Sequence, residues 1–161
     1  LSHGTRTQNG QRSFQTEMWV GESIDKVFDF FADPNNLEEI TPPWLKFKVM
    51  SPQPLSVGFG AIIDYRLHVH GVPISWQSEI TEWDPHRRFV DVQKKGPYHQ
   101  WVHTHEFKPS AGGTLVRDTV NYSVPGGIIA DKLLVRRDLE HIFGYRQSKL
   151  TELLTPKATT S

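Results

Sequence analysis

Strand-like segments follow one another from residue 45 to residue 124, and only short turns separate them. Within them, apolar and polar residues alternate, or β-branched and aromatic residues gather, as in half-buried strands. Gly71-Val72 alone divides two of the segments, which is typical of a hairpin. Because connections this short join antiparallel neighbours, the run predicts an antiparallel sheet. The predicted strands are residues 45–51, 59–70, 73–84, 89–96, 100–109 and 114–124.

One more strand and two short helices precede this run. Residues 12–20, "RSFQTEMWV", alternate in the manner of a strand. Ser23 is a helix-capping residue, and the apolar residues after it recur at helical spacing. Asp33 followed by Pro34 is a second start signal, and we expect that helix to extend to Ile40, where "TPP" ends it.

The last element is the longest. Residues 128–154, about 27 in all, place apolar side chains at helical spacing, and nothing but Gly144 interrupts them. An interior glycine costs about 1 kcal/mol relative to alanine, so Gly144 is a tolerated residue, a bend or a point of close backbone approach. The order of strand, two helices, six strands and one long helix is an α+β fold. We expect the sheet to curve around the long helix, which is too narrow to fill the concave face and therefore leaves an apolar pocket.

Composition argues against several classes of function. The 18 basic and 18 acidic residues balance, which argues against a nucleic-acid partner. The chain has no cysteine, so disulfides and thiolate metal sites are excluded. We find no apolar run of the roughly 20 residues that an integral membrane segment needs and no signal-peptide pattern, and we expect a cytoplasmic location. The 161 residues indicate one domain, residues 12–154, between flexible tails at 1–11 and 155–161.

Three stretches carry a likeness to a known group of proteins: "VFDFFADPNNLEEITPPWLKFKV", "FVDVQKKGPYHQWVHTHEF" and "TLVRDTVNYSVPGG". With the order of elements, they make residues 12–154 resemble the START-like, or SRPBCC, superfamily. That group includes the birch-pollen-allergen fold, polyketide cyclases and dehydratases, and coenzyme Q carriers. The resemblance implies a helix-grip fold, in which a seven-stranded curved antiparallel sheet wraps around a long C-terminal helix. It also implies an apolar pocket that works without an obligatory metal or other cofactor.

The stretch "QWVHTHEF" places two histidines on the predicted concave face. Residues two apart in a strand face the same way, so Trp101, His103, His105 and Phe107 share one face. The opposite face carries Thr104, Glu106 and Lys108 and belongs in water, so the histidines point inward. On the neighbouring strands the same rule turns three more polar side chains inward, namely Asp91, Gln93 and Asp118.

Three interpretations of this polar group remain open. A buried carboxylate needs a partner, and a histidine supplies one, so the group is a structural hydrogen-bonded network under the first interpretation. Under the second it anchors a ligand or acts as an acid–base patch. Under the third, two histidines and a carboxylate hold a metal; the resemblance argues against this one, and we expect no metal.

The function that we predict is binding of a hydrophobic small molecule, of aromatic, polyketide or lipid-like character. The first alternative is a cyclase or dehydratase in which His103 is the base and Asp91 orients it. The second is a regulatory protein-interaction module, which would need an exposed apolar patch; a homodimer is compatible with the sequence. His68 and His70 are expected to face solvent. The predicted ligand-binding residues are His103, His105, Asp91, Gln93, Trp76, Tyr65, Trp101, Asp118, Tyr122, Phe31, Ile142 and Phe143.

Overall fold

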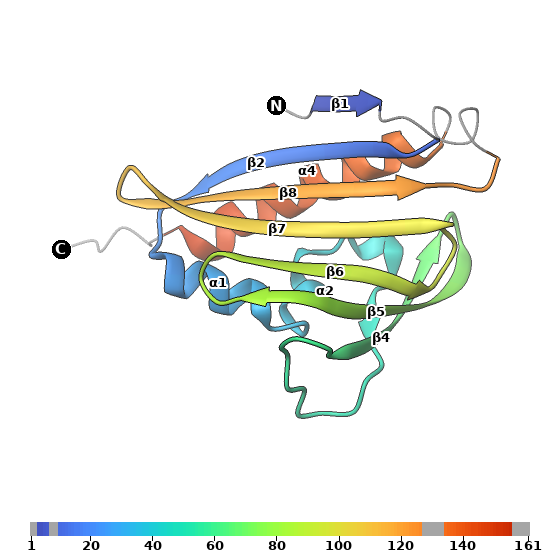
Figure 1. The fold of residues 1–161 in the computed structure, drawn as a ribbon, viewed down its shortest axis with the longest axis horizontal. Coiled ribbons are helices and arrows are strands. Elements are labelled where there is room, and N and C mark those ends of the chain that lie inside the picture. The colour runs from blue at the N-terminus through green and yellow to red at the C-terminus, as the bar shows by residue number, and fades with distance from the viewer. Residues whose placement is uncertain (1–2, 7–9, 127–133, 156–161) are drawn as a thin grey trace.

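A single antiparallel sheet forms most of the molecule (Figure 1). The computed structural model describes residues 3–6, 10–126 and 134–155. The strand order is β1-β2-β8-β7-β6-β5-β4-β3, so strands that follow one another in the chain are neighbours except where β8 returns to pair with β2. The strands are β1 (His3–Arg6), β2 (Arg12–Val20), β3 (Lys48–Val49), β4 (Ile62–Val69), β5 (Val72–Asp84), β6 (Arg88–Lys95), β7 (Gln100–Ser110) and β8 (Gly113–Ser123).

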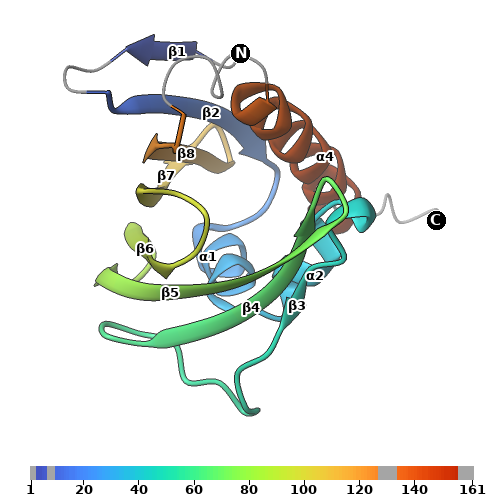
Figure 2. The ribbon, with the colours of Figure 1, turned by 90° about the vertical axis from the view of Figure 1, so that its right-hand side faces the viewer.

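The sheet curves, and one long helix crosses its open side (Figure 2). This helix, α4 (Arg136–Leu154), contacts β2 and the short helix α2 (Asn36–Ile40). A further helix, α1 (Ile24–Ala32), packs against β7 and β8. The arrangement confirms the predicted helix-grip fold and its α+β class. Within the described residues, no helix combines the length and the apolar character needed to cross a membrane. The helices are α1 (Ile24–Ala32), α2 (Asn36–Ile40), the 3-10 helix η1 (Pro43–Leu45) and α4 (Arg136–Leu154).

The predicted capping and spacing signals account for α1. The side-chain oxygen of Ser23 accepts a hydrogen bond from the backbone N–H of Lys26, which satisfies one of the free donors at the start of the helix. Val27, Phe28 and Phe31 form its buried stripe. They pack against the concave face of the sheet, so α1 fills one part of the hollow and leaves the rest to α4.

The structure differs from the sequence prediction at the two ends of the sheet. Residues 3–6, expected in a flexible tail, form β1 and pair with β2, whose outer edge would otherwise leave its backbone groups unpaired. Gly10, at φ 75°, adopts the left-handed conformation just before β2 begins. At the other end, the predicted strand 45–51 is reduced to β3, because η1 occupies its start.

The long helix is described from residue 134 onward, and the part predicted for residues 128–133 lies outside the described residues. Gly144 is exposed, and a Cβ built there would meet no atom within 4 Å. The alternative of a close backbone approach at Gly144 is therefore wrong, and the glycine is a tolerated residue on the solvent side of α4.

Candidate functional site

Strand register brings two aspartates and two histidines together on the concave face. Asp91 on β6 lies opposite His103 on β7, and His105 on β7 lies opposite Asp118 on β8. Cross-strand partners share one face of a sheet, so the four side chains form one group. His103, His105 and Asp118 are 6%, 4% and 5% exposed, which confirms that both histidines point inward.

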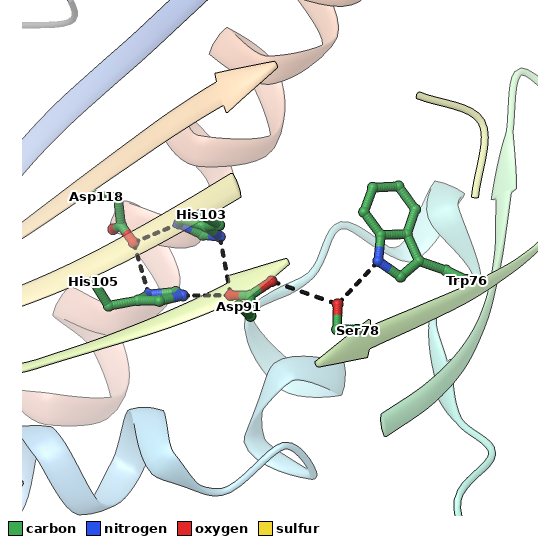
Figure 3. A network of polar contacts seen from close by, with 6 residues as sticks. All are labelled: Trp76, Ser78, Asp91, His103, His105 and Asp118. Carbon is green, nitrogen blue, oxygen red and sulfur yellow. Dashed lines mark hydrogen bonds and ion pairs between the residues drawn. The ribbon is translucent and has the colours of Figure 1, made fainter. Parts of the chain in front are cut away.

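The four side chains form a closed ring of polar contacts (Figure 3). His103 Nε2 lies 2.9 Å from Asp118 Oδ1, and His105 Nδ1 lies 3.0 Å from the same oxygen. On the other side, His105 Nε2 lies 2.9 Å from Asp91 Oδ2, while His103 Nδ1 is 3.7 Å from it, too far for a hydrogen bond. The hydrogen bond that orients His103 is therefore made with Asp118, while the expected partner Asp91 contacts His103 only at ion-pair distance.

The ring continues toward β5 through a hydroxyl group. Ser78 donates its O–H to Asp91 Oδ1 at 3.5 Å, and the indole N–H of Trp76 donates to the Ser78 oxygen at 3.1 Å. Trp76 and Ser78 are two apart on β5 and share its inward face, as their alternation predicts. The chain of contacts thus links four adjacent strands, β5 to β8.

Burial and pairing shift the pKa values of the two aspartates in opposite directions. Burial by itself raises the pKa of Asp118, but hydrogen bonds from His103 and His105 outweigh it and hold that pKa well below its ordinary value. The pKa of Asp91 is lowered in the same way, because burial is outweighed by the hydrogen bond from His105 and the charges around it. Both aspartates are therefore ionised at neutral pH.

The pKa values of the two histidines shift in opposite directions. Burial lowers the pKa of His105, but its hydrogen bonds to Asp118 and Asp91 outweigh burial, and the net pKa is raised. For His103, burial and then the neighbouring His105 lower the pKa, and its contacts with the aspartates do not restore it. His105 thus favours the charged form between two carboxylates. His103 favours the neutral form, with Nε2–H directed at Asp118 and a lone pair on Nδ1.

A cavity of about 330 Å³ lies between the sheet and α4, within the usual size range of small-molecule sites. Its wall is mostly apolar and aromatic, and Asp91, His103 and His105 are the part of the ring that reaches it. Trp44, 57% exposed, stands at its mouth. Nine of the predicted ligand-binding residues line the cavity: Phe31, Tyr65, Trp76, Asp91, Trp101, His103, His105, Ile142 and Phe143.

Three predicted residues do not line the cavity. Asp118 lies behind the two histidines and acts through them. Tyr122 is packed into the core beneath Trp101. Gln93 instead holds the connection between β6 and β7, because its side-chain amide donates to the carbonyl of Tyr98 and accepts from the N–H of the same residue.

Sequence reasoning missed several polar residues at the cavity. His70 faces solvent as expected, with its side chain 57% exposed, but it also lines the cavity, and its Nε2 is 2.8 Å from Asp138 Oδ2 on α4. No sequence signal connects a turn between strands with a helix 68 residues later. Arg146 also lines the cavity, and here a signal existed, since it falls seven residues after Leu139 on the buried stripe of α4.

A metal would find its ligands in the same ring. Asp91, His103 and His105 each offer one ligand atom, and these atoms lie within 4.8 Å of one another. Asp118 would then accept hydrogen bonds from the ring nitrogens that face away, as carboxylates beside metal-bound histidines do. The same atoms are satisfied without an ion, because His105 Nε2 and Asp91 Oδ2 are at hydrogen-bond distance.

A curved sheet, a helix across it and a partly polar cavity between them define the class of helix-grip proteins. The chain belongs to the family described as "Polyketide cyclase / dehydrase and lipid transport", whose model matches residues 20–144. This match confirms the resemblance to the START-like, or SRPBCC, superfamily. No curated protein sequence matches the chain significantly.

Solved structures with this fold come from distant organisms. A protein of Mycobacterium smegmatis is 16% identical, with a TM-score of 0.71 over 90% of this chain and 91% of that one. Ginseng major latex-like protein 151 from Panax ginseng is 12% identical, with a TM-score of 0.68 over 92% and 100%. A Thermus thermophilus protein is 22% identical, with a TM-score of 0.63 over 87% and 94%. At these identities the likeness shows the fold alone.

Proposed function

We propose that the chain binds a hydrophobic small molecule, of aromatic, polyketide or lipid-like character, in the cavity between the sheet and α4. The observation that carries this proposal is an aromatic-lined cavity of about 330 Å³ with a few polar groups gathered on one wall. Apolar burial supplies affinity in such sites, while convergent polar groups fix orientation. The neutral His103 and the Ser78–Asp91 pair supply donors and acceptors for a ligand's polar end.

A cavity-filling variant tests this proposal. Ile142 on α4 lines the cavity, whereas Ser148 on the same helix is exposed. We expect Ile142→Trp to abolish binding of the neutral apolar dye N-phenyl-1-naphthylamine, followed by its fluorescence, because the indole occupies the hollow. Ser148→Trp adds the same bulk outside and should leave binding unchanged. Equal binding by both variants, or no binding by the unaltered chain, would contradict the proposal.

A second candidate function is acid–base catalysis on the bound molecule, in keeping with the family's cyclases and dehydrases. The observation in its favour is that the pKa of His103 is lowered while that of His105 is raised. His103 is oriented by Asp118 at 2.9 Å and favours the neutral form, which is the state that a general base needs. His105, charged and hydrogen-bonded to Asp91, is the corresponding acid. Together they could remove one proton and return another during an aldol closure or a loss of water.

Catalysis and binding separate in the variant His103→Gln. An amide of similar size keeps a polar contact to Asp118 but cannot serve as a base at neutral pH. If the site is catalytic, turnover of an aromatic β-hydroxyketone to its dehydrated product, followed by absorbance, should fall at least about 100-fold while dye affinity is retained. An unaltered chain that binds the compound and leaves it unchanged over background would exclude this reaction.

A further inference from the structure

Arg146 is a charged residue in the otherwise apolar stripe that α4 turns toward the cavity. Leu139, Phe143 and Leu150 are buried on this stripe, and Arg146 falls between the last two at the same helical spacing. Ile142 and Phe143 line the cavity beside it. The side chain that sequence spacing would assign to the core is thus a guanidinium at the wall of the binding cavity.

Arg146 lacks a partner among the described residues. Its Nε and Nη1 atoms are buried and make no hydrogen bond, and no carboxylate lies within ion-pair distance of the guanidinium. Two arginines nearer the surface differ in this respect, since Arg117 pairs with Glu17 and Arg136 with Glu140. The contact that Arg146 does make is with the ring of Phe143, whose centroid lies 4.9 Å from the guanidinium carbon. An aromatic face attracts a cation but accepts none of these hydrogen bonds in the plane of the guanidinium.

Asp91, the carboxylate of the ring that lines the cavity, already has a partner for each oxygen within the protein. Asp91 feels the positive charge of Arg146, but its Oδ2 atom is bonded to His105 and its Oδ1 atom to Ser78. Phe143 contacts both systems: its ring centroid lies 5.6 Å from that of His103 and 4.9 Å from the guanidinium carbon of Arg146. The guanidinium therefore lines the same cavity as the ring without a hydrogen bond or ion pair to it.

A cation with buried donors and no acceptor is an unfavourable arrangement. Water cannot reach the buried nitrogens, and the described protein atoms do not satisfy them. The long side chain can rotate to meet an acceptor placed in the cavity, and a carboxylate suits a guanidinium best, because it offers two oxygens and the opposite charge.

We propose that the molecule bound in this cavity carries a carboxylate, which Arg146 binds while the aromatic wall holds the apolar body. This inference rests on the proposed binding function and narrows the ligand class to hydrophobic acids. His103 Nδ1, which makes no hydrogen bond within the ring, is left to accept one from a second polar group of the same ligand.

Two matched probes and two matched variants test the proposal. The probes are 2-naphthoate and 2-naphthalenemethanol, which share an aromatic body and differ in the charged group. The variants are Arg146→Met, which keeps the length of the side chain and removes the charge, and Arg137→Met, which removes an exposed arginine from the same helix. Dissociation constants are measured by calorimetry at pH 7 with a chelator present, so that a stray metal does not contribute.

We expect the unaltered chain to prefer the acid to the alcohol. Arg146→Met should weaken binding of the acid by about 10- to 100-fold and leave the alcohol unaffected, while Arg137→Met should bind both probes as the unaltered chain does. Arg146→Lys, which keeps the charge, should recover part of the loss. Equal affinity for acid and alcohol in the unaltered chain would overturn the inference and leave the binding function standing, and this result needs no variant to fold. Failure to bind either probe would overturn both.

Discussion

Removing the carboxylate of Asp118 is the most informative perturbation of the ring, because two histidines depend on one oxygen. Asp118 Oδ1 lies 2.9 Å from His103 Nε2 and 3.0 Å from His105 Nδ1, and the aspartate is 5% exposed. A hydrogen bond to a charged group contributes about 1.5–3 kcal/mol, and one between neutral groups about 0.5–1.5 kcal/mol. Asp118→Asn keeps the acceptor oxygen and loses the charge. The hydrogen bond to His103 and the ion pair with His105 then each weaken by about 1 kcal/mol, and the free energy of unfolding falls by about 2 kcal/mol.

Asp118→Ala removes the acceptor of His103 and the carboxylate beside His105 Nδ1, so that both buried nitrogens lose their partner. Each buried donor without a partner costs about 1–3 kcal/mol, so the expected loss is about 4 kcal/mol. In thermal melts at pH 7, a chain of this length loses about 2–4 °C per kcal/mol, which gives about 4–8 °C for Asn and roughly twice that for Ala. Asp64→Asn on β4 is the matched control: its exposed side chain accepts from Gln77, an interaction that an amide oxygen retains.

The difference in unfolding free energy between the unaltered chain and Asp118→Asn should also depend on pH. The pKa of Asp118 in the folded chain lies well below its ordinary value of 3.8, so the unfolded chain takes up the proton first as the pH falls. The stability contributed by this carboxylate is therefore fully present above about pH 5 and is lost on acidification. We expect the gap in unfolding free energy between the unaltered chain and Asp118→Asn to narrow from pH 7 to pH 3. A variant as stable as the unaltered chain at pH 7, or a gap independent of pH, would refute the reasoning.

Three further predictions concern the helices, each measured as a change in unfolding free energy by urea denaturation. Gly144→Ala should stabilise the chain by up to about 1 kcal/mol, because the added methyl group meets no neighbour; destabilisation would show a hidden constraint at that position. Leu150→Ala should cost about 2–5 kcal/mol at a residue that is 1% exposed. Leu153→Ala, at 41% exposure, should cost far less, and equal losses for the two variants would contradict the packing of α4 that buries Leu150 and exposes Leu153. Ser23→Ala should cost about 1 kcal/mol through loss of the cap on α1.

Periodicity alone was enough to predict the framework of this fold. The alternation in β7 assigned His103 and His105 to the concave face, because a period of two leaves one alternative, and that alternative would bury Glu106 and Lys108. β1 escaped prediction because four residues with a glycine carry no alternation. Its position depends on the free edge of β2, which is a property of the folded sheet.

Pairing within the ring depends on register, which a single sequence does not reveal. Knowing that Asp91, His103, His105 and Asp118 all point inward does not tell which aspartate orients which histidine. A shift of two residues between β6 and β7 preserves every face and exchanges the partners. Arg146 was missed for a different reason. An arginine in an amphipathic helix is ordinarily assigned to solvent, and the spacing that places it with Leu139 and Phe143 becomes persuasive only when the cavity is known.

The positions of the tryptophan side chains allow ligand binding to be followed by intrinsic fluorescence. Trp76 and Trp101 meet edge to face on the cavity wall with ring centroids 5.3 Å apart, and Trp44 stands at the entrance. Trp19 does not line the cavity; it is 52% exposed, and its indole N–H donates a hydrogen bond to the carbonyl of Ser110. Intrinsic emission should therefore divide into a part quenched by whatever enters and a part that stays constant. A titration can be followed with no label attached, and replacing both Trp19 and Trp83, neither of which lines the cavity, by phenylalanine would remove the constant background from the signal.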